Sequence, residues 1–280
     1  MTRTLTHSLL IGTAGLALSG CSWLGMGGPT YTAPAPVAAP GVYAPAAAPC
    51  CQPRLSKWNL EGGVGPSFLA FGDAVTGEEA HAQLGADLRD LSMDTVYQDG
   101  VRVEAGVSKA LAPNTKLSLT GNYTNHDSEG VVDWGTIGGE RLTGGLSDYT
   151  SYGAEAGLRQ YGRIARAPLV RSVRPYVEGR LGASYVEGID VVGATLAGAP
   201  VAGGADIGFY EGGWVPTAAG LVGVETPFIG NSTIGLETGL RYSGKLEADE
   251  AIAPTSPLAG SNNGASRWSV PVMLRGRYRF

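Results

Sequence analysis

Apolar and polar side chains alternate with a period of two in eight separate segments between residue 57 and the C-terminus. In the second segment, for example, Val101 and Val103 alternate with Arg102 and Glu104. A period of two is that of a β-strand, whose successive side chains point to opposite faces. The pattern therefore predicts an all-β fold with eight antiparallel strands. The segments occupy residues 58–68, 101–108, 116–123, 152–159, 177–185, 217–225, 233–242 and 268–280.

The first 20 residues have the pattern of a secretion signal. Arg3 precedes an apolar run over residues 9–18, and small residues follow that run. The sequence Leu18-Ser19-Gly20-Cys21 resembles the lipobox of bacterial lipoproteins. This resemblance implies cleavage before Cys21 and acylation of that cysteine with chains such as palmitate, and Ser22 after it favours sorting to the outer membrane. Three acyl chains would make the anchor effectively permanent.

Residues 21–56 form a lipid-anchored linker in this interpretation. Their Pro/Ala-rich sequence, as in Ala33-Pro34-Ala35-Pro36, predicts a disordered, extended tether with nothing to pack. Cys50 and Cys51 stand next to each other near its end. An oxidising periplasm could join each of them to another chain or to a small thiol, and two thiols without a role are the alternative.

The alternation alone leaves open which strand face meets water. In a soluble periplasmic lipoprotein the apolar face would line the core. Three observations favour the opposite arrangement: segments of about ten residues match a tilted membrane strand, eight is the smallest even strand number of outer-membrane barrels, and the ending Tyr278-Arg279-Phe280 resembles the C-terminal signal for insertion of such barrels. We therefore predict an eight-stranded antiparallel transmembrane β-barrel over residues 57–280, with Tyr278 and Phe280 as insertion signal for the barrel-assembly machinery.

The polar strand faces carry charges of both signs. In this arrangement these charged side chains point into the barrel lumen. Side chains roughly fill the interior of an eight-stranded barrel, and buried charges are tolerated when they are paired. We therefore predict a filled lumen with a paired network, in which glycines leave room for long arginine side chains. Lys116 and Arg279 share these faces. The predicted network comprises Glu61, Arg102, Glu104, Glu155, Arg159, Glu178, Arg180, Glu225, Glu237, Arg241, Arg275 and Arg277.

The connections between the segments alternate in length, which predicts an orientation. Those after the first, third, fifth and seventh segments are long, whereas the others are short or intermediate. Outer-membrane barrels have long extracellular loops and short periplasmic turns, so both termini should be periplasmic. The four long loops hold 17 acidic and 3 basic residues, a net charge of −14 in a chain of −5. They would meet lipopolysaccharide through divalent cations, or an unknown surface ligand, or only water.

Three local features add predictions. Thr76-Gly77-Glu78-Glu79 has the form of a helix capping box, and Leu84, Leu88 and Leu91 would follow on one helix face. The loop around residues 191–207 is apolar enough to contain a further short hairpin. Pro271 falls on the lumen face in the middle of the last strand, where it predicts a bulge or a displaced register.

The composition supports this interpretation mainly by exclusion. The chain has 44 Gly and 17 Pro among 280 residues, and only 16% of its residues are charged. No strict Gly-X-Y period indicates collagen, and no run of roughly 18 uncharged apolar residues indicates a transmembrane helix. Apolar residues recur throughout and the net charge is small, which argues against disorder of the whole chain.

One constellation raises the question of enzymatic chemistry. His126-Asp127-Ser128, with Glu140 farther along the same loop, offers a base, a hydroxyl and carboxylates at spacings that nucleophilic catalysis can use. It resembles the His-x-Ser element of lipid A deacylases, although in that family the element lies late in the barrel. We expect no catalytic site, no metal site and no cofactor.

Residues 57–280 resemble the transmembrane domain of OmpA and the Omp25-like barrels of alphaproteobacteria, through strand pattern and terminal signal. The resemblance implies a structural or surface-interaction role in the cell envelope. We therefore predict a non-enzymatic outer-membrane lipoprotein, whose partners are outer-membrane lipids and lipopolysaccharide and which binds no nucleic acid. The alternatives are a narrow pore, a lipid A-modifying enzyme that uses His126 and Ser128, and a soluble periplasmic lipoprotein.

Overall fold

The structure is a computed structural model that describes residues 58–77, 86–167, 170–201, 206–250, 252, 258, 260–262 and 266–280. The chain divides into two compact units, Met1–Arg54 and Leu55–Phe280. All described residues belong to the second unit. The predicted signal at 1–20, the lipidation site Cys21, the tether and the pair Cys50-Cys51 lie outside the described residues.

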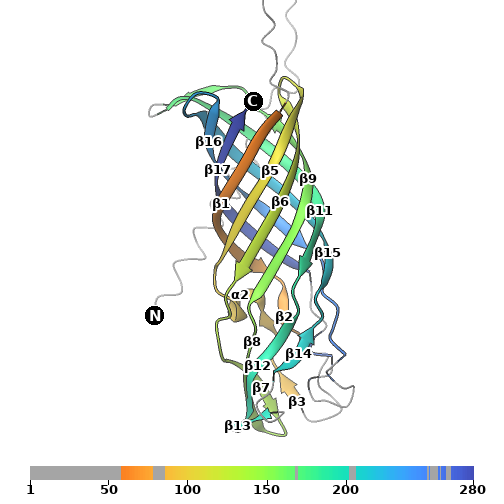
Figure 1. Cartoon of the computed structure of the whole chain (residues 1–280). Coiled ribbons are helices and arrows are strands. Elements are labelled where there is room, and N and C mark those ends of the chain that lie inside the picture. Colours follow the sequence, from red (N-terminus) through yellow and green to blue (C-terminus); the bar gives the residue numbers. More distant parts are fainter. Residues whose placement is uncertain are drawn as a thin grey trace, which may run out of the picture. The chain divides into compact units, whose positions relative to one another are not determined.

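Eight long strands close into an antiparallel barrel (Figure 1). Each strand pairs with the strands before and after it in the chain, and the last pairs with the first. Each of the eight predicted segments coincides with one of these strands, apart from the terminal Phe280, so the prediction of an eight-stranded antiparallel barrel is confirmed. The strands are β1 (Trp58–Phe71), β5 (Gly100–Ala112), β6 (Thr115–His126), β9 (Tyr149–Tyr161), β11 (Val170–Val186), β15 (Gly213–Pro227), β16 (Ser232–Ser243) and β17 (Arg267–Arg279).

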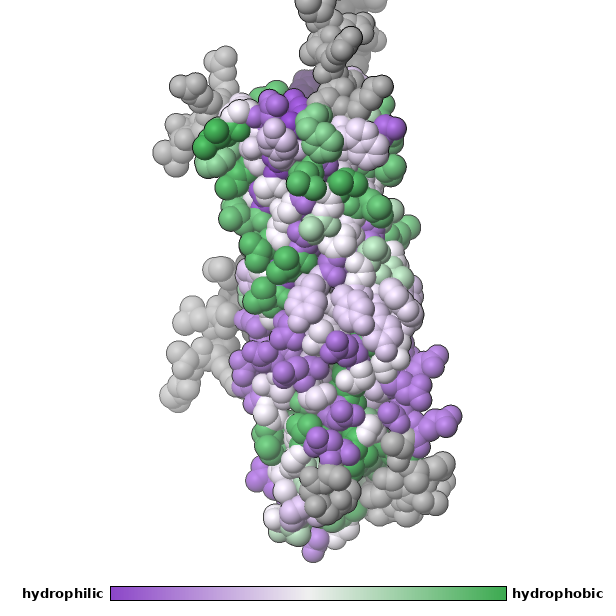
Figure 2. Space-filling view, in the orientation of Figure 1, coloured by the Kyte–Doolittle hydropathy of each residue, from purple (hydrophilic) through white to green (hydrophobic). Residues whose placement is uncertain are grey.

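The outer wall of the barrel is apolar. Leucine and valine side chains of the predicted apolar faces are exposed, and the charged faces are buried. Figure 2 shows apolar residues over this wall, with hydrophilic residues between the barrel and the loops at one end. This distribution is the reverse of that in a water-soluble barrel, since there the apolar face lines the core.

Aromatic side chains mark both edges of the apolar wall. At one edge, strand register places Tyr123, Tyr152, Tyr185 and Trp214 on four neighbouring strands, and Tyr242 beside Trp268 on two others. At the other edge, Trp58, Tyr278 and Phe280 are exposed. Ten residue steps along β17 join Trp268 to Tyr278, about 25 Å along the axis for strands tilted by about 40°. That height matches the apolar band of an outer-membrane barrel.

The four long loops form a second folded layer at one end of the barrel, which we call the cap. A six-stranded sheet and a two-stranded sheet build it. Its hydrophobic core contains fully buried side chains such as Trp134, Leu146, Ile189 and Phe209. The cap elements are β2 (Asp73–Val75), β3 (Ala86–Leu88), β4 (Leu91–Ser92), α2 (Met93–Val96), β7 (Val132–Ile137), β8 (Glu140–Leu146), β12 (Ile189–Leu196), β13 (Ala199–Pro200) and β14 (Ile207–Tyr210).

The opposite end of the barrel, the turn end, has short connections. Two residues join β5 to β6 and four join β15 to β16. The intermediate connection contains β10 (Ala165–Ala167), which pairs with the start of β11. The predicted alternation of long and short connections is therefore confirmed. Among the described residues, no α-helix is both long enough and apolar enough to cross a membrane.

Two local predictions were wrong, and one is confirmed. Leu88 and Leu91 lie in strands β3 and β4 and pack into the cap core, so they do not form a helix face; Glu78 to Gly85 lie outside the described residues. The ladders on both sides of Pro271 keep one register, and β1 shifts instead between Leu69 and Phe71. The hairpin predicted near residues 191–207 exists as β12 paired with β13 and β14.

Candidate functional site

The barrel lumen holds the twelve charged residues that the alternation selected, and we call them the lumen network. Six are glutamates and six are arginines, so their formal charges cancel. None is more than 7% exposed, and Arg159 has no exposed surface. Because each of the eight strands turns alternate residues inward, side chains far apart in the sequence meet at the barrel axis. Glu61 and Arg159, for instance, lie 98 positions apart and their side chains hydrogen-bond at 2.8 Å.

Glu104 is the centre of the network. Its carboxylate lies 2.7 Å from Arg102 Nε and 2.7 Å from Arg180 Nη1, and 3.4 Å from Arg241 Nη1. Arg275 Nη2 also donates to it. Four guanidinium groups from four different strands therefore converge on one buried carboxylate of β5.

The remaining ion pairs connect the other members to this centre. Arg159 bridges Glu61 and Glu178, and Arg180 reaches Glu178 at 2.9 Å. At the turn end Arg277 pairs with Glu61 and with Glu225. Further pairs join Arg275 to Glu237 and Arg241 to Glu155. All twelve residues thus belong to one connected set of ion pairs.

Neutral groups add further hydrogen bonds to this set. The Ser118 hydroxyl donates to Glu178 at 2.6 Å, and the Tyr176 hydroxyl donates to Glu237 at 2.8 Å. The ring of Tyr176 also faces the guanidinium groups of Arg159 and Arg277, at 5.0 and 4.8 Å from the ring centre. Such contacts stabilise a buried charge beyond its ion pair. The lumen is filled by paired side chains, a geometry that opposes ion flow.

Glycines on the inner wall make this filling possible. A Cβ atom at Gly157 would lie 2.6 Å from Ser118 Oγ and 2.8 Å from both Arg180 Cγ and Glu178 Oε1. No real Cβ tolerates three contacts of this kind without displacing a member of the network. The prediction that lumenal glycines leave room for the long charged side chains is confirmed at this position.

Three further cations lie near the two ends of the lumen. Lys116 stands over the Tyr161 ring at the turn end, 5.1 Å from its centre, and Arg279 is exposed there. Arg267 at the cap end is only 5% exposed. Arg267 was not predicted as a lumen residue, because the last predicted segment begins at Trp268. Extending the period of two by a single residue would have placed Arg267 on the lumen face.

The structure gives His126 and Ser128 separate partners. The buried His126 ring bonds through Nδ1 to the carbonyl oxygen of Gln98 at 3.1 Å and packs edge-on against Tyr149. The Ser128 hydroxyl accepts a hydrogen bond from the Gly130 N–H at 3.1 Å. No hydrogen bond joins the two side chains, so a base that activates a serine is not assembled here. Within the described part of the chain, no group of three or more His, Cys, Asp or Glu is placed to hold a metal ion.

The cap has an exposed charged cluster, formed by one residue on β7, one on β8 and one between β3 and β4. Asp133 lies 3.2 Å from Arg89 and 3.0 Å from Arg141. The Gly135 N–H, which donates to Asp133 at 3.0 Å, together with Arg141 and Arg89, holds the pKa of this carboxyl below its usual value. Because the cluster is exposed, it fixes the local strand geometry more than it adds stability.

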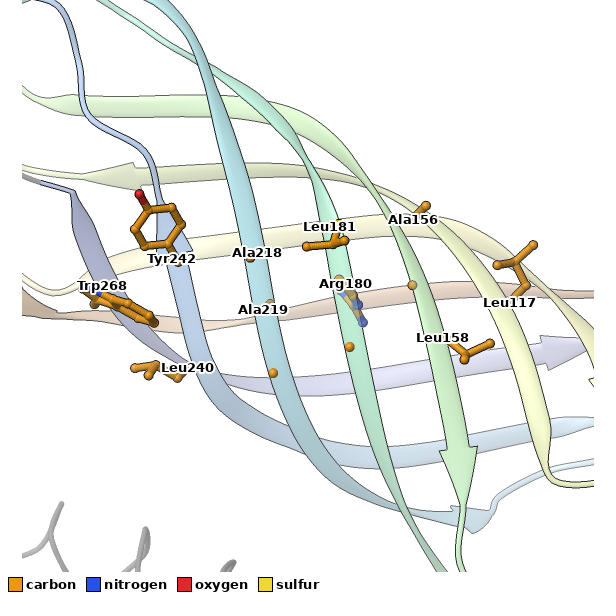
Figure 3. A pocket seen from close by; sticks show the side chains of 13 residues that line it. Leu117, Ala156, Leu158, Arg180, Leu181, Ala218, Ala219, Leu240, Tyr242 and Trp268 are labelled. Carbon is orange, nitrogen blue, oxygen red and sulfur yellow. The ribbon is translucent and has the colours of Figure 1, made fainter.

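The outer wall has a shallow apolar groove of about 750 Å³ that runs from β6 to β17 across β9, β11, β15 and β16. Figure 3 shows Leu240, Tyr242 and Trp268 toward one end of the groove, Leu117 and Leu158 toward the other, and Ala218, Ala219 and Leu181 between them. The groove arises because small residues form its floor. Its lining suits hydrocarbon rather than a polar ligand. The floor residues are Ala156, Gly179, Ala218 and Gly220, and the larger residues include Leu117, Leu158, Leu240, Tyr242 and Trp268.

The sequence matches no protein-family model and no curated protein. Among solved structures, the chain is similar to Neisserial surface protein A (12% identity, TM-score 0.44, covering 80% of this chain and 97% of that one). It is also similar to the attachment invasion locus protein Ail of Yersinia pestis in complex with the heparin analogue sucrose octasulfate (14%, 0.38, 80% and 99%). A third similar structure is the outer membrane protein OprG of Pseudomonas aeruginosa (14%, 0.36, 80% and 97%). Each similarity is one of fold, with few identical residues.

Proposed function

We propose that this chain is a non-enzymatic outer-membrane β-barrel lipoprotein that holds a folded cap at the cell surface, in a structural or surface-interaction role. The observation that carries the proposal is the inside-out barrel. Its apolar wall lies between two aromatic edges about 25 Å apart, and a neutral set of buried ion pairs fills its lumen. An apolar outer wall is stable when the hydrocarbon of a membrane surrounds it. A lumen filled by paired side chains fits a structural barrel better than an ion channel.

The orientation follows from the two barrel ends. Barrels of this class place short turns in the periplasm and long loops outside. The turn end also contains the start of β1, where the Phe280 N–H donates to the Trp58 carbonyl oxygen. A lipid anchor at Cys21 would therefore insert into the periplasmic leaflet of the outer membrane. Tyr278 and Phe280, which we propose as the insertion signal, lie at the turn end of the barrel, which faces this leaflet. The cap then faces lipopolysaccharide and external partners.

Protease accessibility in intact cells tests this topology. A protease site introduced at Gly138-Gly139, an exposed turn of the cap, should be cut in whole cells. The matched site at Gly230-Asn231, an exposed turn at the other end, should be cut only after the outer membrane is permeabilised. Cleavage of the second site in intact cells, or of neither after permeabilisation, would overturn the orientation or the membrane insertion.

The lipid anchor needs its own test, since the barrel alone does not require it. Cells fed an alkyne analogue of palmitate should label the wild-type chain and not a Cys21→Ala variant. A Cys50→Ala/Cys51→Ala variant is the control, which should keep the label. Labelling that survives Cys21→Ala would exclude this anchor while leaving the barrel proposal intact.

A further inference from the structure

A cavity of about 40 Å³ lies at the cap end of the lumen, above the centre of the network. Residues from all eight barrel strands line it. About 10–15 Å³ suffices to hold one water-sized particle, so the space accommodates one small ion with room to spare. Its wall consists largely of groups that donate hydrogen bonds. These include the hydroxyls of Ser151, Ser184 and Thr217 and the guanidinium groups of Arg102, Arg241 and Arg267.

Arg267 contributes a positive charge to this wall without a carboxylate partner among the described residues. Its Nη2 donates to the Gly244 carbonyl oxygen at 3.1 Å, and its guanidinium carbon lies 4.9 Å from the centre of the Tyr149 ring. Both partners are uncharged, and Nε makes no hydrogen bond. A buried charge is costly unless it is paired. Arg267 therefore calls for a counter-ion.

Two other arginines present unused donors in the same wall. Arg102 Nη2, Arg241 Nη1 and the Thr217 hydroxyl make no hydrogen bond to the protein, although Arg241 Nη1 lies 3.4 Å from Glu104. Glu155 also lines the cavity, but its carboxylate already pairs with Arg241 and lies 3.7 Å from Arg102. Since the lumen network is neutral by itself, Arg267 leaves one buried positive charge in excess among the described residues.

We propose that this cavity binds one small monovalent anion, with the size and charge of chloride or bromide. A spherical anion accepts hydrogen bonds from several directions at once, which suits donors that arrive from β5, β15, β16 and β17. Its single negative charge would neutralise the excess that Arg267 creates. The bound ion would hold the first residue of β17 against the inner wall and so tie the cap to the barrel.

Unfolding in detergent of the refolded chain from residue 21 to the C-terminus provides the test. Urea titrations at constant ionic strength would compare sodium chloride with sodium gluconate, whose anion is too large for the cavity. An ion that binds only the folded state raises the ratio of folded to unfolded protein about tenfold for each tenfold rise in its concentration above its dissociation constant. We expect this dependence for chloride and bromide in the wild type, and its loss in Arg267→Gln.

Arg174→Gln is the matched control. Arg174 also lies over a tyrosine ring, 4.2 Å from the centre of Tyr161, and donates to the Pro113 carbonyl oxygen at 3.2 Å. It is at the turn end, only half-buried, and should leave the chloride dependence unchanged. A wild type that is equally stable in chloride and gluconate, or an Arg267→Gln variant with the wild-type dependence, would overturn the proposal.

Bromide diffraction keeps the proposal testable if Arg267→Gln does not refold. Crystals of the wild type grown in sodium bromide should give an anomalous difference peak between Arg102, Arg241 and Arg267. A bromide data set without a peak at this position would mean that water alone occupies the cavity, and the proposal would fall.

Discussion

Replacing Glu104 with Gln is the sharpest perturbation of the lumen network, because four arginines converge on this one carboxylate. The variant keeps the shape of the side chain and removes its charge. It also places an amide NH₂ group against the four guanidinium groups, which are hydrogen-bond donors and cannot accept a bond from it. Two of the contacts that it weakens, to Arg102 and Arg180, are 2.7 Å long.

The expected cost can be bounded from the geometry. Removing one partner of a buried ion pair costs about 3–5 kcal/mol, because the other charge stays buried. Here each arginine that loses Glu104 keeps an ion pair with another glutamate, namely Glu155, Glu178 or Glu237. The loss should therefore remain within that range instead of multiplying by four. About 3–5 kcal/mol corresponds to a shift of roughly 10²- to 10⁴-fold in the unfolding equilibrium.

Equilibrium urea unfolding of the refolded barrel in lipid vesicles, followed by tryptophan fluorescence and by heat-modifiable gel mobility, measures this cost. Glu225→Gln is the control. Within the described part of the chain Glu225 has a single arginine partner, Arg277, and it is the most exposed member of the network at 7%. Its cost should be about 1–3 kcal/mol. If Glu104→Gln costs less than about 1 kcal/mol, or no more than Glu225→Gln, the central role of Glu104 is refuted.

Three further predictions concern the cap and the lumen. Trp134→Ala should destabilise the cap by about 3–5 kcal/mol, since the ring is 1% exposed and donates to Gly144 O at 3.0 Å; the cap should become protease-sensitive while the barrel keeps its gel shift, and loss of both would contradict a separately folded cap. Burial raises the pKa of Tyr97 in the cap, so its contribution to stability is complete below the unfolded value of about 10 and is lost as pH rises above it; in urea unfolding above pH 10 the wild type should lose more stability than Tyr97→Phe, and the same pH dependence in both would oppose this. The wild-type barrel in planar bilayers should give no unitary currents, and steady currents would contradict the filled lumen.

The barrel could be predicted from the sequence because its determinants are local. A period of two is imposed wherever one strand face meets lipid and the other meets a packed lumen, so each segment carries its own signature. Every member of the predicted lumen network was found in this way, and all are buried. The individual ion pairs could not be predicted from the sequence, because the position of Arg159 beside Glu61 depends on the stagger of strands across the whole barrel.

The cap was harder to foresee because its strands are short and its partners are distant. The spacing of Leu88 and Leu91 fits one face of a helix equally well. They lie in strands because β3 pairs with β7 and β4 pairs with β2. The Thr76 hydroxyl of the capping-box pattern donates to the carbonyl oxygens of Gly260 and Ser261 on the last loop, and Glu78 and Glu79 lie outside the described residues. Tertiary pairing outweighs propensity in segments of two or three residues.

The alternation of strand faces predicts which charged side chains are buried in the lumen. Whether such a charge has an oppositely charged partner depends on strand register and burial, which only the structure shows. Arg267 has the same parity as Arg275 and Arg277 on β17, and each of these two meets a glutamate of the network. Arg267 lies eight to ten residues along the strand from these two arginines, under the cap, where its guanidinium group contacts the Tyr149 ring and the Gly244 carbonyl oxygen. A neutral count for the network therefore coexists with a local excess of positive charge at one end, and it is this local excess that makes the cap-end cavity a site for an anion.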